Sequence, residues 1–340
     1  MQYVDTLVCS APGTLVLEKR PAPERAPEHT LVRPRRIGIC GTDYHIFEGK
    51  HPFLNYPRVI GHELAVEVVE PDPESPLPAG TLCVVNPYLS CGHCIACRAG
   101  KPNCCVSISV LGVHEDGGMA GLLSVPTGNL IAAPGLTADE CATVEFLAIG
   151  AHAVGRGGVT GRDRVLVVGA GPIGLGTALF ASLAGGRVTI FDMDPDRTAA
   201  ARSMLGLDGL PASDDPLAAA AAVTDGEGFD VVFDATGNRR AMQTGFGFVA
   251  HGGRYVLVGV VKEEITFADP DFHRKEMSLF GSRNATSADF RRVLAALGEG
   301  RIPVAAIITH RTSLAGAVRD IPLWATEKTG LIKALVEIEG

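Results

Sequence analysis

The chain has 340 residues, of which 46% are apolar and 20% charged, and its formal net charge at pH 7 is −8. This length exceeds one ordinary hydrophobic core and suits two domains, and the composition is that of a folded globular protein rather than a disordered one. A negative charge without a basic run, together with only 6% aromatic residues, argues against a nucleic-acid partner and favours a small ligand.

The start of the chain and its cysteine content predict where the protein works. The first residues, MQYVDTLVCSAPG, lack the basic segment and apolar run of a secretory signal. Nine cysteines in such a chain favour metal binding over disulfides, so we expect a cytoplasmic protein. The uncharged stretch from Val165 to Gly186 is long enough to span a bilayer, but its many glycines predict a strand, a turn and a helix, and hence no membrane partner.

The first 150 residues predict a β-rich domain. Strand-like segments such as Thr30 to Ile39 and Val59 to Glu70 alternate with turn residues, and PDPESPLP from Pro71 to Pro78 predicts a surface loop. A helical pattern covers about Ala138 to Val154.

From Arg164 onwards, strands alternate with helical stretches. The strand-like segments are RVLVVG, RVTIFD, FDVVFDAT and GGRYVLVGVV, and a helical pattern follows each of the first three. This alternation predicts a parallel sheet with helices on both faces, which is the doubly wound α/β fold. A further strand near Ser278 to Gly281, a helix over Ala288 to Leu297 and the strand-like LIKALVEI complete the chain, and we expect the last part to pack on the first domain.

Closely spaced cysteines predict a closed metal site. Cys91, Cys94 and Cys97 follow one another at intervals of three, and the pair Cys104-Cys105 offers a fourth thiolate from the far side of a short loop. Four sulfurs around one point make a tetrahedral zinc site with no vacant position. We therefore expect a structural zinc, and the spacing leaves the choice between Cys104 and Cys105 open.

A glycine-rich turn predicts a dinucleotide site. It follows an apolar strand, opens a helix and consists of Gly169, Ala170, Gly171, Pro172, Ile173 and Gly174. The glycines permit a tight turn, close approach of a pyrophosphate and close packing of helix on strand. Asp192 ends the next strand, where a carboxylate binds ribose hydroxyls and repels a 2′-phosphate. We expect NAD as cofactor, although the nearby Arg197 also leaves room for NADP.

A second set of potential metal ligands comes from separate segments. Cys40 and the pair His62-Glu63 supply a thiolate, an imidazole and a carboxylate. A mixed set of only three protein ligands leaves one zinc position for water or substrate, as in catalytic sites. No second histidine follows His62 at the spacing of the metalloprotease helix, so that function is not expected.

These motifs together resemble the zinc-dependent medium-chain dehydrogenase/reductase superfamily over nearly the whole chain. The resemblance rests on GICGTD from Gly38 to Asp43, on GHE from Gly61 to Glu63, on the cysteine lobe and on the glycine turn. It implies a GroES-like catalytic domain over residues 1–150, with the structural zinc lobe at about 88–106. It also implies a Rossmann domain over residues 151–287 and a segment, 288–340, that returns to the catalytic domain.

The resemblance also implies which residues carry the chemistry. It assigns the catalytic zinc to Cys40, His62 and a carboxylate that is either Glu63 or Glu145, and for the structural zinc it selects Cys105 over Cys104. Thr42 is implied at the substrate hydroxyl and His45 farther along a proton relay, because a hydroxyl donates and accepts and an imidazole exchanges protons near neutral pH. The residues implied beside the nicotinamide are Ala235, Thr236, Val258, Gly259 and Val260.

Two segments, Val110 to Gly118 and Gly281 to Thr286, are similar to segments of bacterial L-galactonate or L-gulonate 5-dehydrogenases. This similarity implies a sugar acid whose secondary hydroxyl is oxidised to a ketone by hydride transfer. A guanidinium offers a matched fork of donors to a carboxylate. The candidate substrate contacts are His114, Arg283 and Asn284, and the candidate pocket walls are Phe53 and Tyr56.

Two other readings stay open. One is an L-threonine or sorbitol-type dehydrogenase, and the other is a catalytically silent NAD-binding zinc protein that retains the fold. The intact set Cys40, His62, Glu63 and Glu145 favours an enzyme. The superfamily also suggests a homo-oligomer, either a dimer or a tetramer, and we expect the strand near Gly253 to Val261 to lie at a sheet edge, where it could pair with a second copy.

Overall fold

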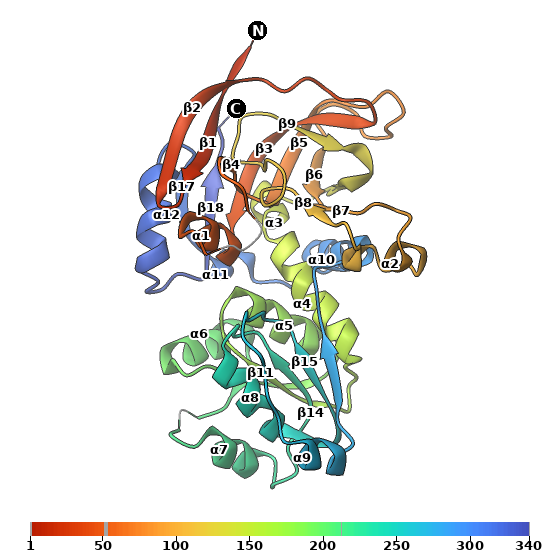
Figure 1. The fold of residues 1–340 in the computed structure, drawn as a ribbon, viewed down its shortest axis with the longest axis vertical. Helices are drawn as coiled ribbons and strands as arrows, with labels where there is room; N and C mark the ends of the chain where they lie inside the picture. Colours follow the sequence, from red (N-terminus) through yellow and green to blue (C-terminus); the bar gives the residue numbers. More distant parts are fainter. Residues whose placement is uncertain (1, 51–53, 212, 340) are drawn as a thin grey trace. The chain divides into compact units, whose positions relative to one another are not determined.

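The structure is a computed structural model that describes residues 2–50, 54–211 and 213–339. The chain forms two compact units. The first unit comprises Met1–Glu145 together with Thr286–Gly340, and the second comprises Phe146–Ala285. The last part of the chain therefore belongs to the same unit as the first part, as the red and blue ribbons of Figure 1 show.

A seven-stranded sheet forms the centre of the first unit. Its order is β10-β6-β5-β3-β18-β17, with β9 paired to β3, and β18 lies between β3 and β17. The strands are β3 (His29–Ile39), β5 (Glu63–Glu70), β6 (Leu82–Val85), β9 (Leu123–Pro126), β10 (Leu130–Ala132), β17 (Ile308–Ser313) and β18 (Lys333–Glu337). Apolar side chains of β3 and β5, such as Ile37, Leu64 and Val66, are fully buried and form much of the core.

Shorter elements complete the first unit. A three-stranded sheet has the order β2-β1-β4, and β7 pairs with β8. These strands are β1 (Tyr3–Ala11), β2 (Thr14–Pro21), β4 (Arg58–Val59), β7 (Tyr88–Leu89) and β8 (Ser109–Val110). The helices are α1 (Gly41–Phe47), α2 (Ile95–Arg98), α3 (Ala138–Cys141), α10 (Ser287–Gly298), α11 (Val304–Ile307) and α12 (Ala317–Thr326).

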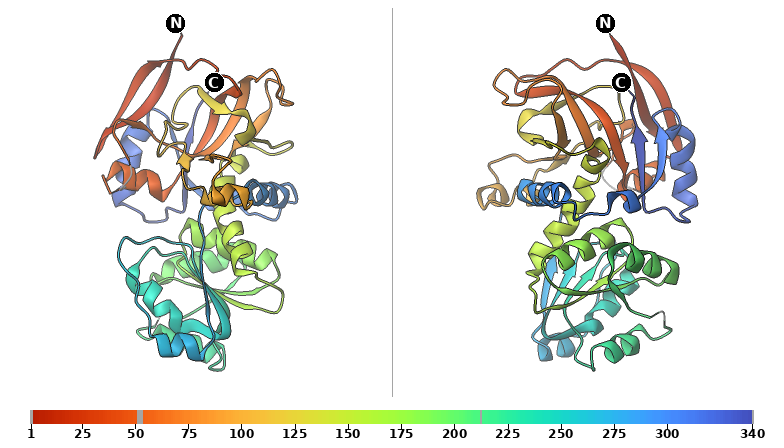
Figure 2. Two further views of the ribbon diagram at one scale, coloured as in Figure 1. Left: turned by 45° about the vertical axis from the view of Figure 1, so that its right-hand side comes forward. Right: turned by 180° about the vertical axis from the view of Figure 1, so that it is seen from behind.

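The second unit is built on six parallel strands. Their order is β13-β12-β11-β14-β15-β16, and they are β11 (Arg164–Val168), β12 (Arg187–Phe191), β13 (Asp208–Gly209), β14 (Phe229–Asp234), β15 (Val249–Leu257) and β16 (Ser278–Gly281). The helices are α4 (Val144–Gly157), which begins in the first unit, α5 (Pro172–Leu183), α6 (Pro195–Leu205), α7 (Pro216–Val223), α8 (Arg239–Phe248) and α9 (Asp269–Arg274). Figure 2 shows helices on both sides of this sheet. The chain winds outwards from β11 in both directions, so the predicted Rossmann architecture is confirmed.

One expectation about the sheet is wrong. The strand near Gly253 to Val261 is β15, and it is not at the edge, because it pairs with β14 on one side and β16 on the other. The outer strands are β13 and β16. The segment SLFG forms β16, which follows the short helix α9 and pairs in parallel with β15. Without β16, β15 would be the outer strand of the sheet.

The apolar stretch from Val165 to Gly186 forms most of β11, the glycine turn and α5. Within the described ranges, none of the helices has the length and apolar character that crossing a membrane requires.

Candidate functional site

Three potential metal ligands meet where β3 ends and β5 begins. Cys40 directly follows β3, His62 directly precedes β5, and Glu63 is the first residue of β5. The antiparallel pairing of these strands sets Gly38 opposite Glu63, which brings the two segments together. One ligand atom from each of Cys40, His62 and Glu63 lies within 4.8 Å of the other two. A thiolate, an imidazole and a carboxylate at this separation fit a zinc ion with one position left for another ligand.

Asp43 holds the two ligand segments together. Its buried carboxylate accepts a hydrogen bond from the backbone N–H of Cys40 at 2.9 Å and another from the N–H of Gly61 at 3.1 Å. Burial raises the pKa of Asp43, and the nearby His62 opposes that rise. We predicted no role for Asp43 from the sequence. An acid at the third position of a helix can, however, accept hydrogen bonds from the backbone N–H groups at the start of that helix.

His62 lies in an environment that fits a bound cation. The side chain is 5% exposed, and its Nδ1 has no hydrogen-bond partner and lies 3.8 Å from Oδ1 of Asp43. Burial works against a charged imidazole, but Cys40, Asp43 and Glu145 outweigh it and raise the pKa of His62 well above its usual value. A buried ring nitrogen without a partner, surrounded by acidic groups, is what a metal site provides before the ion is added.

Glu63 forms an ion pair with a buried lysine that was not predicted from the sequence. Lys333 of β18 donates to both carboxylate oxygens of Glu63, at 2.7 and 2.8 Å, and to the carbonyl oxygen of Ile39 at 3.1 Å. The side chains of Lys333 and Glu63 are only 1% and 0% exposed. Gly38 provides the space, because a Cβ there would lie 2.0 Å from a carboxylate oxygen of Glu63. The sequence signal was a single lysine within the apolar segment LIKALVEI.

Glu145 is also buried near this site, in the first turn of α4. Its carboxylate accepts a hydrogen bond from the hydroxyl of Tyr88, which the expectations also omit. Burial raises the pKa of Glu145, and the charge of His62 counteracts this effect. Among the described residues, the compact group of ligand atoms includes Glu63 and does not include Glu145.

The two predicted relay residues both lie on α1. Thr42 is partly buried, and its hydroxyl oxygen is 3.8 Å from the sulfur of Cys40. His45 lies three residues farther along the same helix and is exposed. The helix therefore leads from the metal ligands to the surface of the first unit.

The predicted substrate contacts belong to different units. His114 is exposed in the first unit, and its Nδ1 accepts a hydrogen bond from the N–H of Val110 at 3.1 Å. Arg283 and Asn284 follow β16 in the second unit, where Arg283 is exposed and Asn284 has a positive φ of 53°. Of the predicted pocket walls, Phe53 lies outside the described residues, and Tyr56 donates a hydrogen bond to the carbonyl oxygen of Ile46.

The cysteine lobe gathers four sulfurs around one point. The Sγ atoms of Cys91, Cys94, Cys97 and Cys105 lie within 4.8 Å of one another, and Cys104 is exposed and outside this group. Backbone N–H groups, with that of Cys97 contributing most, lower the pKa of Cys94 to about 6. A thiolate held by backbone donors within a set of four sulfurs fits a closed tetrahedral zinc site.

The glycine turn of the second unit has the shape that a pyrophosphate needs. Gly169 has a φ of +100°, and a Cβ at Gly174 would lie 1.7 Å from the carbonyl oxygen of Gly169, so both positions require glycine. A Cβ at Gly171 would meet no heavy atom within 4 Å, which leaves open space at the N-terminus of α5. Pro172 and Ile173 form the first turn of that helix.

The carboxylate of Asp192 lies against the same turn. One oxygen accepts from the N–H of Ala170 at 2.8 Å, and the other accepts from the N–H of Asp194 at 3.0 Å. Arg197 forms an ion pair with Asp194 at 3.7 Å. The hydrogen bonds fix the position of an acid beside the turn, where ribose hydroxyls are held in folds of this kind.

Two further segments meet at the carboxyl edge of the parallel sheet. The N–H groups of Val258 and Gly259 both donate to the carbonyl oxygen of Asp234, each at 2.9 Å, which sets the end of β15 beside the end of β14. Val260 is 85% exposed at this edge. Ala235 and Thr236 follow β14, and a Cβ at Gly169 would approach them within 3.2 Å. All the predicted cofactor residues thus lie at the edge where doubly wound sheets bind ligands.

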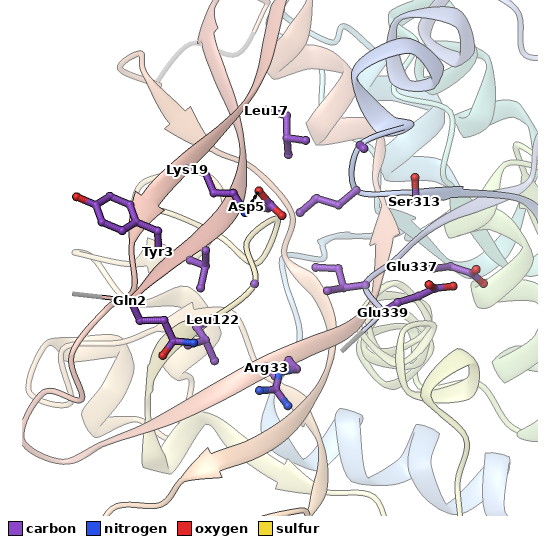
Figure 3. Close-up of a pocket in the computed structure, with 15 residues that line it drawn as sticks. Gln2, Tyr3, Asp5, Leu17, Lys19, Arg33, Leu122, Ser313, Glu337 and Glu339 are labelled. Atoms are coloured by element: carbon purple, nitrogen blue, oxygen red, sulfur yellow. Dashed lines mark ion pairs between the residues drawn. The ribbon is translucent and has the colours of Figure 1, made fainter.

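A cavity of about 390 Å³ in the first unit lies apart from these residues. Figure 3 shows its lining, which includes Leu17, Lys19, Arg33 and Glu337, and the ion pair of 2.9 Å between Lys19 and Asp5. None of the predicted site residues lines this cavity.

Comparisons with known proteins agree with the fold and with the predicted chemistry. Residues 26–135 match the model of the alcohol dehydrogenase GroES-like domain, and residues 172–299 match the model of the zinc-binding dehydrogenases. L-Galactonate-5-dehydrogenase of Escherichia coli K12 is 40% identical over 338 residues, which is 99% of each chain.

Solved structures give the same result. The L-idonate 5-dehydrogenase of E. coli K-12 superposes with a TM-score of 0.91 at 27% identity, covering 99% of each chain. RspB of E. coli CFT073, described as a short chain alcohol dehydrogenase and solved with NADH, superposes with a TM-score of 0.93 at 29% identity, covering 99% of this chain and all of that one.

Proposed function

Because this chain belongs to the zinc-dependent medium-chain dehydrogenases, we propose that it oxidises the C5 hydroxyl of a sugar acid to a ketone. The preferred substrates are L-galactonate or L-gulonate, and NAD accepts the hydride. The observation that carries this proposal is the full-length match to an L-galactonate-5-dehydrogenase at 40% identity, combined with the open ligand set of Cys40, His62 and Glu63.

The geometry supports a division of labour among the buried residues. Cys40, His62 and Glu63 would hold the catalytic zinc, because they form the compact ligand group. Glu145, buried nearby and held by Tyr88, would orient water or substrate beside that group. When bound, zinc supplies a Lewis acid that lowers the pKa of the substrate hydroxyl. Zinc at the four cysteines of the lobe would be structural, because that site has no open position.

Thr42 and His45 would remove the proton. The hydroxyl of Thr42 can accept the substrate's proton while it donates its own, and it lies beside Cys40. His45 is exposed on the same helix, so its imidazole can exchange that proton with solvent near neutral pH.

The second unit would bind NAD rather than NADP. The open space at Gly171 would accommodate the pyrophosphate, and the fixed carboxylate of Asp192 would favour ribose hydroxyls over a 2′-phosphate. Arg197, the residue that would support NADP, is paired with Asp194.

A substrate panel tests this proposal. Initial rates of NADH and NADPH formation are measured with L-galactonate, L-gulonate, sorbitol and L-threonine, and zinc is counted per chain. The proposal requires two zinc ions and the highest kcat/KM with one of the two acids and NAD. Preference for sorbitol or L-threonine would support the other dehydrogenase readings, and cofactor binding with no turnover on a broad alcohol panel would indicate a silent protein.

We further propose a homo-oligomer, a dimer or tetramer, located in the cytoplasm. The outer strand β16 is the surface on which a second copy could extend the sheet, and its Leu279 is 40% exposed. Light scattering tests the assembly, and cell fractionation tests the location.

A further inference from the structure

The buried ammonium of Lys333 is hydrogen-bonded to both segments that carry the potential metal ligands. It has three N–H donors, and it contacts both oxygens of Glu63 and the carbonyl oxygen of Ile39. Ile39 is the residue before Cys40, so the same lysine contacts both the carboxylate and the backbone beside the thiol. Lys333 is thus a fixed positive charge at the edge of the ligand group.

Glu63 is shared between this charge and the metal position. Both of its oxygens accept from Lys333, and one of them lies within 4.8 Å of the ligand atoms of Cys40 and His62. The carboxylate has little room to retreat, because the backbone of Gly38 is packed against it. A carboxylate has about four lone-pair sites, so it can accept from the ammonium and still face a cation.

We propose that Lys333 is a positioning residue that competes with zinc for the carboxylate of Glu63 and so weakens its hold on the metal. This inference rests on the proposed function, because it takes Cys40, His62 and Glu63 as the catalytic zinc ligands. A positive charge on the far side of a carboxylate ligand reduces the electron density that the ligand donates to the metal. The same charge also repels a divalent ion. A weakly held carboxylate is readily displaced, which keeps a coordination position available to the substrate.

The stabilisation that zinc gives to a Lys333 variant distinguishes this role from a purely structural one. In Lys333→Met without zinc, the carboxylate of Glu63 is buried with no positive partner, which is strongly unfavourable. With zinc bound, the ion itself is the partner, so the variant gains more from zinc than the wild type does. A lysine that only stabilised the fold would leave the gain from zinc unchanged when it was removed.

The test uses the full-length protein with Lys333→Met and Lys333→Gln, both of which remove the charge, while glutamine keeps a donor. Zinc loss to a chromogenic chelator and thermal unfolding with and without zinc are measured on each. Partners of metal ligands typically change metal affinity about 10-fold to 100-fold. We expect the more labile zinc to leave both variants at least about 10-fold more slowly, and the unfolding temperature to rise more on zinc addition than in the wild type.

Two controls connect the effect to Glu63. In Cys40→Ser the phase of zinc loss that the Lys333 substitutions slow should be absent, which identifies the ion lost in that phase as the catalytic zinc. Adding Glu63→Gln to Lys333→Met should return the rate of zinc loss to that of Glu63→Gln alone. The visible spectrum of the cobalt-substituted protein should differ between Lys333→Met and wild type, because the strength of a ligand changes.

Several outcomes would overturn the inference. One is a rate of zinc loss that is unchanged or faster in both Lys333 variants than in wild type. Another is a fall in unfolding temperature that is the same with and without zinc. Failure of both variants to fold with excess zinc would also contradict it, because zinc should replace the missing charge. A wild-type protein that holds zinc only at the four cysteines would instead refute the proposed function, so the two failures are distinguishable.

Discussion

Alanine at Gly171 should weaken NADH binding without harming the fold. The residue has φ −74° and ψ 179°, which alanine adopts readily, and its Cβ would meet no heavy atom within 4 Å. A Gly to Ala change at such a position is neutral or stabilises by about 0.4 to 1 kcal/mol. The added methyl would occupy the space in which we propose that the pyrophosphate binds, so the cost should appear only when the dinucleotide binds.

The size of the effect follows from the general cost of adding one methyl group to a filled site. Forcing an extra methyl into a filled site costs about 1 to 3 kcal/mol, which is about a 5-fold to 140-fold rise in Kd at 1.4 kcal/mol per tenfold. Gly174→Ala is the matched control, because its Cβ would lie 1.7 Å from the carbonyl oxygen of Gly169. That overlap disturbs the turn itself, so we expect a loss of about 3 kcal/mol or more and a fall in Tm of at least about 6 °C.

Titration of NADH fluorescence and thermal unfolding measure the two effects. Both can be followed without turnover, so the result does not depend on the catalytic zinc or on the substrate. The reasoning fails if Gly171→Ala binds NADH within twofold of wild type. It also fails if this variant loses as much thermal stability as Gly174→Ala does.

Three further predictions concern the metal sites and the return of the chain. Cys40→Ser should remove one zinc per chain and lower kcat/KM about a thousandfold, since metal catalysis supplies several kcal/mol; elemental analysis and rates check this. Cys105→Ser should remove the other zinc and lower Tm, and an unchanged Tm would show that the lobe is dispensable. Hydrogen bonding from Arg311 lowers the pKa of Asp139 below its usual 3.8, so its stabilisation is present above that value and is lost as pH falls through the lower folded pKa. The stability difference between wild type and Asp139→Asn, from urea titrations, should therefore shrink below about pH 4 and not above it.

Structural features that are formed by a few neighbouring residues can be predicted from the sequence. The turn from Gly169 to Gly174 and the cysteines from Cys91 to Cys97 depend on local spacing, because a few neighbouring residues fix both the backbone and the side chains involved. The parallel sheet also follows from the alternation of strands and helices. The place of each strand within the sheet does not, since a short apolar strand pairs equally well with several neighbours, and for this reason β15 was wrongly expected at the edge.

The missed residues of the site depend on contacts over long separations. Lys333 and Glu63 are 270 positions apart, and they meet only because β18 pairs with β3. Tyr88 reaches Glu145 from another segment, and neither periodicity nor spacing indicates that contact. The role of Glu145 itself came from resemblance alone, because an acid in the first turn of a helix is common on surfaces.

The position of β18 has a consequence for the order in which the protein is made. This strand is inserted between β3 and β17, and it carries the lysine that contacts Glu63 across 270 positions of the chain. On the ribosome, Cys40, His62 and Glu63 are therefore synthesised long before β18, the strand that pairs with β3 beside them. Until β18 has emerged, a growing chain exposes these side chains without their fixed positive neighbour, so the surroundings of Glu63 are completed only when the two distant segments pair.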